Sequence, residues 1–181
     1  ESHSKGSARG GAIVTRSGNV TMNGNGTISF RNNSATASVE YGTATGGAIF
    51  ADYDITMRDN QSVEFVSNSV FSPYHVALGG AIESWGKLVM TNNGSVRFKD
   101  NSARVAQTIY PGACGGAIWH GSDEILLSDN EHVEFIGNRA MQGGAISTQA
   151  NLNIRNNGYA LFEKNTELYG GAYRRVGNHG I

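Results

Sequence analysis

The sequence predicts an all-β fold, a right-handed parallel β-helix (solenoid) of about five to six coils with three short strands each. First, two motifs, Gly-Gly-Ala and Phe-x-x-Asn, alternate along the chain at a nearly constant offset. Second, apolar residues come in period-2 pairs, which are typical of strands only a few residues long. Third, no window shows a sustained 3.6-residue period, so we expect no helix.

The Gly-Gly-Ala motif marks the start of each predicted coil. From its first glycine to the next motif phenylalanine, the chain takes 19 or 20 residues in all five complete copies. The two adjacent glycines allow a sharp corner and a close approach of neighbouring coils. We therefore expect one β-helix domain over 1–181, with coils starting near Gly10, Gly46, Gly79, Gly115, Gly143 and Gly170.

Each coil is expected to hold one strand at the Ala-Ile of the glycine motif, one at a Leu-x-Ile type pair and one at a Val-x-Phe type pair. Stacked coils would then place one phenylalanine above the next, as an internal stack of Phe30, Phe65, Phe98, Phe135 and Phe162. Because a repeat of this size cannot bury its apolar face alone, stacking supplies the core.

Asparagines recur five residues before and three residues after each motif phenylalanine, at the predicted corners. Their amides can bond to backbone and to the next coil, and asparagine tolerates the left-handed backbone that corners require. The sequence therefore predicts two structural ladders, one of Asn25, Asn60, Asn93, Asn130 and Asn157, and one of Asn33, Asn68, Asn101, Asn138 and Asn165.

Composition and charge argue against several classes of function. Charged residues make up 16% of the chain and the formal net charge is −1, so no global field attracts nucleic acid or an anionic membrane. The single cysteine, Cys114, cannot form an internal disulfide or build a zinc site. No stretch approaches the apolar length of a membrane helix, and the start reads as loop rather than as a secretory signal. We expect no cofactor, no nucleic-acid partner and no membrane-spanning segment.

The connection from each Phe-x-x-Asn motif to the next glycine pair varies in length. It is short at Arg139–Gln142 and Thr166–Tyr169, and long at Ser34–Thr45, Ser69–Leu78 and Ser102–Cys114. The three long connections belong to consecutive coils, so we expect these insertions to project side by side from one corner. They carry an unusual set of aromatic, aliphatic and proline residues: Tyr41, Val70, Phe71, Pro73, Tyr74, His75, Val105, Ile109, Tyr110 and Pro111.

Such side chains are uncommon in loops that only face water. Since loops on a rigid scaffold commonly carry recognition, the insertions predict a binding patch made of Tyr41, Phe71, Tyr74, His75, Ile109 and Tyr110. The alternative is that these side chains pack on one another and shield the flank of the coil.

A catalytic site on a β-helix needs carboxylates, or a base with Arg or Lys, on one face of successive coils. The position before each motif phenylalanine reads Ser29, Glu64, Arg97, Glu134 and Leu161. In a catalytic interpretation, Arg97 would bind a carboxylate of the substrate, and Glu64 or Glu134 would act as the base. The favoured interpretation is a surface ion-pair ladder, so no catalytic residue is assigned.

Acidic residues and histidines show no pattern of metal ligands. Asp52 and Asp54 flank Tyr53, and Asp123 precedes Glu124, where turn-forming acids are expected. No two histidines have metal-ligand spacing on one face, so no metal site is predicted. Two tryptophans, Trp85 and Trp119, follow the glycine motif in neighbouring coils; an exposed one would suit sugar stacking, and packing under a loop is the alternative.

The pairing of Gly-Gly-Ala-[Ile/Leu/Val] with Phe-x-x-Asn over essentially the whole chain resembles the motif set of the chlamydial polymorphic membrane proteins. That resemblance implies the β-helix passenger of an autotransporter-like protein at the bacterial cell surface or secreted from it, and several members of the family act as adhesins. It also implies that 1–181 is a fragment of a longer surface protein. The last copy departs from the pattern, since Gly170-Gly-Ala-Tyr173 runs into a different ending.

These observations predict a non-catalytic β-helix that binds a host cell-surface or serum protein, or a glycan, through the corner insertions, as an adhesin or immunomodulatory segment. Two alternatives stay open: a carbohydrate-active β-helix enzyme, either lyase or hydrolase, and a purely structural stalk. An outward groove with converging acids and a basic residue would favour the enzyme. A smooth surface without exposed apolar loops would favour the stalk.

Overall fold

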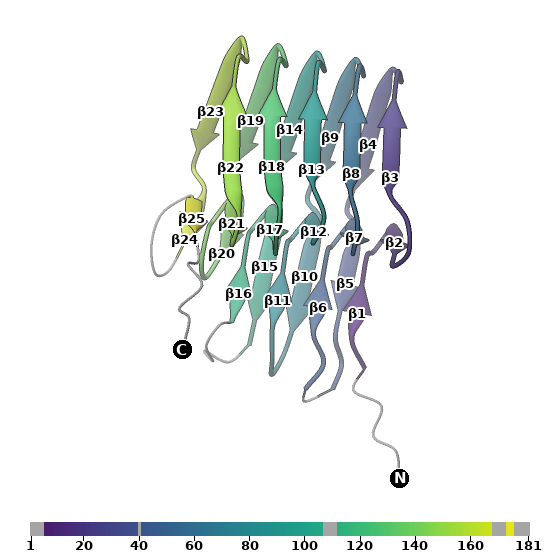
Figure 1. Cartoon of the computed structure of the whole chain (residues 1–181). Coiled ribbons are helices and arrows are strands. Elements are labelled where there is room, and N and C mark those ends of the chain that lie inside the picture. Colours follow the sequence, from purple (N-terminus) through teal and green to yellow (C-terminus); the bar gives the residue numbers. More distant parts are fainter. Residues whose placement is uncertain (1–5, 40, 107–111, 168–172, 176–181) are drawn as a thin grey trace.

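The chain forms a parallel β-solenoid, seen here in a computed structural model that describes residues 6–39, 41–106, 112–167 and 173–175 (Figure 1). Within those ranges the secondary structure is entirely strands and turns, and no helix is long and apolar enough to cross a membrane. The strands lie in five parallel sheets, A to E, and each of the four turns from Ala8 to Ala140 passes once through each sheet. The predicted parallel β-solenoid is confirmed, while its handedness and coil count stay predictions.

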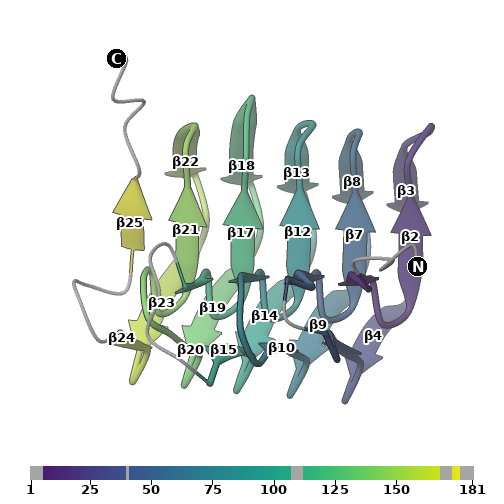
Figure 2. The same cartoon turned by 90° about the horizontal axis from the view of Figure 1, so that it is seen from below.

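The strands of each sheet come from successive turns (Figure 1, Figure 2). Sheet A consists of β1 (Ala8–Arg9), β6 (Ala44–Thr45), β11 (Ala77–Leu78) and β16 (Ala113–Cys114). Sheet B consists of β2 (Ile13–Thr15), β7 (Ile49–Ala51), β12 (Ile82–Ser84), β17 (Ile118–His120), β21 (Ile146–Thr148) and β25 (Tyr173–Arg175). Sheet C consists of β3 (Val20–Asn23), β8 (Ile55–Arg58), β13 (Leu88–Thr91), β18 (Glu124–Ser128) and β22 (Asn151–Arg155). Sheet D consists of β4 (Thr27–Arg31), β9 (Ser62–Val66), β14 (Ser95–Lys99), β19 (His132–Ile136) and β23 (Tyr159–Glu163). Sheet E consists of β5 (Ser34–Thr36), β10 (Ser69–Ser72), β15 (Ser102–Val105), β20 (Arg139–Ala140) and β24 (Thr166–Glu167).

Sheets B, C and D enclose the main core, because the alternating apolar residues of their strands point inward. The register pairs identical positions of successive turns, so each motif phenylalanine lies beside the next. Neighbouring rings are parallel to within 9°, with centroids 4.8 to 4.9 Å apart. That spacing equals the distance between adjacent strands, so the backbone register sets the ring stack. Phe65, Phe98 and Phe135 are fully buried.

The two glycines of the repeated motif meet different requirements, as Gly79 and Gly80 show. Gly79 has φ +64°, a left-handed conformation that costs little only without a Cβ. A Cβ on Gly80 would lie 2.0 Å from the carbonyl oxygen of Gly116 in the next turn. The pair therefore permits both the corner and the close approach of adjacent turns.

The prediction of three strands per coil is wrong, because each long connection contributes two further strands. Their first residues form strands of sheet E and their last residues form strands of sheet A. Small and apolar residues from both sheets pack into a second core, which consists of Val70 and several alanines. Val105 packs against the edge of this core. The insertions are therefore folded parts of the solenoid, and only their tips lie outside the sheets.

Candidate functional site

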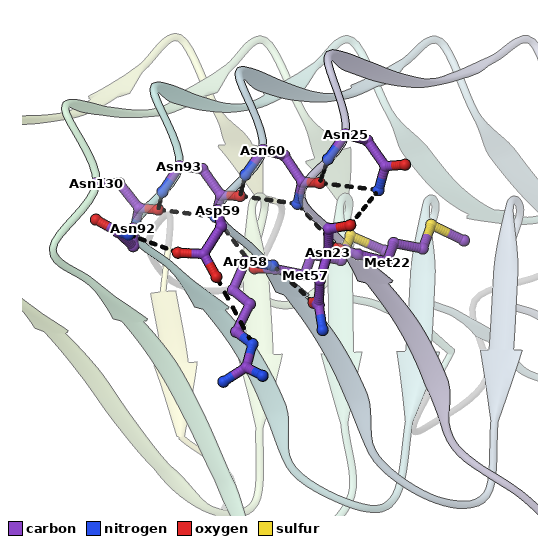
Figure 3. A network of polar contacts seen from close by, with 10 residues as sticks. All are labelled: Met22, Asn23, Asn25, Met57, Arg58, Asp59, Asn60, Asn92, Asn93 and Asn130. Atoms are coloured by element: carbon purple, nitrogen blue, oxygen red, sulfur yellow. Dashed lines mark hydrogen bonds and ion pairs between the residues drawn. The ribbon is translucent and has the colours of Figure 1, made fainter.

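One corner of the solenoid carries a continuous ladder of asparagine side chains (Figure 3). Asn60 shows the pattern: its Nδ2 and its backbone N–H both donate to Oδ1 of Asn93, at 2.9 and 3.1 Å. The second Nδ2 proton donates to the carbonyl of Met22 in the preceding turn, at 2.9 Å. The same contacts continue from Asn25 to Asn157.

A second ladder follows the same geometry at the corner between sheets D and E. It runs from Asn33 to Asn165, and its side chains donate to the carbonyls of the stacked phenylalanines. Asn68, Asn101 and Asn138 are fully buried. Because the amide groups of the inner rungs are hydrogen-bonded within the fold, they hold the turns together and serve the structure rather than a ligand.

The predicted binding patch lies on the insertions, with Tyr41, Tyr74 and His75 at the tips between sheets E and A and Phe71 on β10 of sheet E. Tyr41 and Tyr74 are exposed over 60% and 44% of their surface, and Phe71 and His75 are half-buried. Ser72 ties the two described tips together: its Oγ donates to the carbonyl of Gly42 at 2.8 Å and accepts from the backbone N–H of His75 at 3.1 Å. Ile109 and Tyr110 lie outside the described residues.

The other apolar residues of the insertions have different roles. Val70 is 1% exposed and belongs to the second core, so it is a packing residue rather than part of a binding surface. Phe71, its neighbour on β10, points the other way and lies in register with Thr36 and Arg104 of the adjacent strands. The described part of the patch is therefore Tyr41, Phe71, Tyr74 and His75.

The Glu64–Arg97–Glu134 row lies on adjacent strands of sheet D in the predicted register. Arg97 pairs with Glu134 at 2.9 Å, and Glu64 pairs with Arg31 of the preceding turn. Each acid thus has a cationic neighbour, and the side chains are partly exposed. The row therefore forms two separate surface ion pairs rather than a continuous ladder, each worth about 0–1 kcal/mol.

A buried serine–histidine pair lies inside sheet B, where Ser84 Oγ and His120 Nδ1 are 2.7 Å apart. Both residues are 0% exposed, so no substrate reaches them. Burial lowers the pKa of His120 to about 4, and nearby Asp123 only partly opposes this effect. His120 is therefore neutral at pH 7 and serves packing. The described residues contain no group of three or more His, Cys, Asp or Glu that could hold a metal ion.

A concave corner between sheets A and B holds a cavity of about 500 Å³ that was not predicted from the sequence. Arg9 of β1 and Thr45 of β6 lie on one wall, and Phe50 of β7 and Glu83 of β12 on the other. Trp85 closes one side, and its Nε1–H donates to Oε1 of Glu83 at 3.1 Å. The cavity thus combines aromatic rings, a carboxyl group and a guanidinium group.

Glu83 is the unusual group in this cavity, since it is a carboxyl side chain with only 3% exposure. Burial raises the pKa of Glu83 to about 7, against the lowering effects of Thr45, Trp85 and Arg9. The Thr45 hydroxyl lies close enough to lower the pKa of Glu83. The hydroxyl and the carboxyl group are nevertheless not placed in hydrogen-bond geometry. Glu83 Oε2 and Thr45 Oγ1 are both buried without a hydrogen-bond partner among the described residues.

One sequence signal does point to this cavity. The residue directly after each Gly-Gly-Ala-Ile reads Val14, Phe50, Glu83, Trp119 and Ser147, so a single acid stands in a row of uncharged residues. Trp119 is 6% exposed and packs edge-on against Trp85 with ring centroids 5.0 Å apart, whereas Trp85 is 42% exposed. Of the two tryptophans, only Trp85 is placed to contact a ligand.

The fold and its corner ladders define a repeat-built β-solenoid in which the core is fixed and the insertions vary. Two parts of the chain, residues 27–52 and 132–149, match the Chlamydia polymorphic membrane protein repeat, which confirms the resemblance inferred from the motifs. The first match includes β4 to β7, and the second runs from the start of β19 to the residue after β21. Neither the curated proteins nor the solved structures gave a match to this chain.

Proposed function

We propose that the chain is a non-catalytic segment of a bacterial surface or secreted passenger protein that binds a host protein or glycan through its corner patch. The observation that carries the proposal is the patch itself: two exposed tyrosines at neighbouring tips, Tyr41 and Tyr74, with Phe71 and His75 beside them. The similarity to Chlamydia polymorphic membrane protein repeats supports the surface location.

The patch has the properties of a recognition surface. Tyrosine supplies a large apolar ring and a polar hydroxyl at a low cost in conformational entropy. The tips are held by the Ser72–Gly42 hydrogen bond and by the second core beneath them, so little ordering is required on binding. A rigid scaffold with aromatic side chains at its tips suits binding of a partner surface.

The test is a double variant, Tyr41→Ser with Tyr74→Ser, compared with a matched control that removes two exposed tyrosines elsewhere. Tyr53 and Tyr159 are exposed to a similar extent, 52% and 45%, and do not belong to the patch. Each purified protein is labelled and applied to cultured host epithelial cells, to immobilised serum proteins and to a glycan array.

We expect the patch variant to lose binding to its partner about tenfold or more, because exposed aromatic residues commonly dominate interface energies. The control variant should bind like the unaltered chain. Equal binding by both variants, or equal loss in both, would contradict the proposal and favour a structural stalk.

A further inference from the structure

The cavity between sheets A and B is separate from the corner patch and has the construction of a ligand site. Its volume of about 500 Å³ lies within the range of small-molecule pockets. It is lined by residues from three consecutive turns, including Arg9, Arg16, Thr45, Phe50, Glu83 and Trp85. Only rigid strands and the residues next to them supply these groups, so the cavity is formed before any ligand arrives.

The wall of the cavity contains polar atoms that the fold leaves unsatisfied. Glu83 Oε2 and Thr45 Oγ1 are buried and have no hydrogen-bond partner in the part of the chain that the structure describes. An unsatisfied buried polar atom costs about 1–3 kcal/mol, so it is uncommon without a reason. Hydroxyl groups of a ligand, which both donate and accept, would satisfy the carboxyl group and the threonine together.

Trp85 gives the cavity a fixed aromatic wall. Its ring rests on Gly121, where a Cβ would come within 2.4 Å of the ring, and it contacts the edge of Trp119. Its Nε1–H is held by Glu83 at 3.1 Å, yet 42% of its surface is exposed. A partly exposed indole ring in a fixed position suits stacking against the C–H face of a sugar ring.

The charges of the cavity favour an anion. Arg9 and Arg16 carry positive charge, and neither forms an ion pair with a described residue; Arg9 lies over the Phe50 ring at 5.2 Å. Asp52 carries one negative charge, and Glu83 is held largely in its neutral form below neutral pH because burial raises its pKa to about 7. A guanidinium group binds a carboxylate through two parallel hydrogen bonds, which gives geometric selectivity.

We propose that this cavity binds a carboxylated pyranose, a uronic or sialic acid residue of a glycan, with its carboxylate on Arg9 and Arg16 and its ring against Trp85. Glu83 and Thr45 bond the ring hydroxyls. The site goes beyond the corner patch, because none of the four patch residues lines the cavity.

The test is titration of the purified chain with the methyl glycosides of N-acetylneuraminic acid and glucuronic acid, and with methyl glucoside as the neutral probe. Tryptophan fluorescence reports binding, because both tryptophans lie at or beside the cavity. We expect saturable binding of at least one acidic probe and at least tenfold weaker binding of the neutral one. Equal affinity for acidic and neutral probes, or no saturation by either acidic probe, overturns the proposal.

Two variants separate recognition from folding. The double variant Arg9→Gln with Arg16→Gln should bind the acidic probe about tenfold more weakly, because each substitution removes a charge-assisted hydrogen bond. Its circular dichroism spectrum should be unchanged. Should that double variant disturb the fold, Arg16→Gln alone provides the measurement, because Arg16 is exposed. Undiminished binding by a folded arginine variant refutes the assignment. The tyrosine variants of the corner patch should bind the acidic probe normally, so this site and the patch can fail independently.

Discussion

Replacing Asn93 by alanine should cost far more stability than the same change at the end of its ladder. Asn93 Oδ1 accepts two hydrogen bonds from Asn60, at 2.9 and 3.1 Å, and its Nδ2 donates to Met57 O and Asn130 Oδ1, at 3.1 and 2.9 Å. Alanine removes all four. At about 1 kcal/mol for each bond, with more where a buried partner is left unsatisfied, we expect a loss of about 4 kcal/mol.

The matched control is Asn25→Ala at the first rung. Asn25 donates from its side chain to Asn60 and to the carbonyl of Asn23, and its side chain accepts nothing from a described residue. Because it is exposed, water can replace both partners, and the expected loss is about 1 kcal/mol.

Urea unfolding followed by circular dichroism measures both variants against the unaltered chain. A loss of about 4 kcal/mol is a large share of the roughly 5–15 kcal/mol that stabilises a typical domain, so the midpoint should move clearly. If the two variants differ by less than about 1 kcal/mol, the ladder does not stabilise the fold through buried hydrogen bonds, and the reasoning is refuted.

Three further predictions concern the core, the corner and the buried carboxyl. Phe98→Ala should cost about 3–5 kcal/mol, because a fully buried ring with neighbours on both sides is lost, while Phe162→Ala, at 38% exposure, should cost less than half of that; equal losses in urea unfolding would contradict the stack. Gly80→Ala should destabilise the fold by at least about 1–3 kcal/mol, because the new Cβ would lie 2.0 Å from the carbonyl oxygen of Gly116. Gly24→Ala should destabilise it by about 1–2 kcal/mol through its φ of +67° alone, because no atom lies within 4 Å of the new Cβ. Glu83→Gln removes a carboxyl group whose folded pKa, about 7, exceeds its ordinary value of 4.5. Because the folded state binds the Glu83 proton more tightly than the unfolded state, the stabilisation by unaltered Glu83 is lost as pH rises from 4.5 through 7. Over that window the free energy of unfolding of the variant should rise by up to about 3 kcal/mol relative to the unaltered chain, and a difference that does not depend on pH would exclude the effect.

The sequence predicts the parts of the fold that repeat at a fixed interval. Phe98 and Asn93 recur at the same offsets in every complete copy, and the parallel register then places equivalent residues side by side. Sheets A and E were missed for a physical reason. Their strands are two to four residues long and contribute little more than one alanine or valine each to the second core, so no hydrophobic period marks them.

The candidate sites divide in the same way. The exposed tyrosines of the patch stand out because aromatic residues are unusual in long connections. The cavity depends on Arg9, Thr45 and Glu83, which lie on different turns and in two sheets, and their approach follows from register and corner geometry that a single sequence does not show. Glu83 could have been noticed as the only acid among the residues that directly follow Gly-Gly-Ala-Ile, but its burial could not have been predicted.

The corner between sheets E and A explains how one solenoid holds both short and long connections. In the short connection Arg139–Gln142, Arg139 pairs with Ser102, and Gln142 bridges to Cys114. Ala140 joins the second core, as Val70 does in a long connection. Four residues therefore fill the positions in both sheets that ten residues of Ser69–Leu78 fill in an earlier turn. The additional residues can only leave the stack at the tip, so changes in their length and sequence alter the surface while the ladders and the phenylalanine stack remain in register.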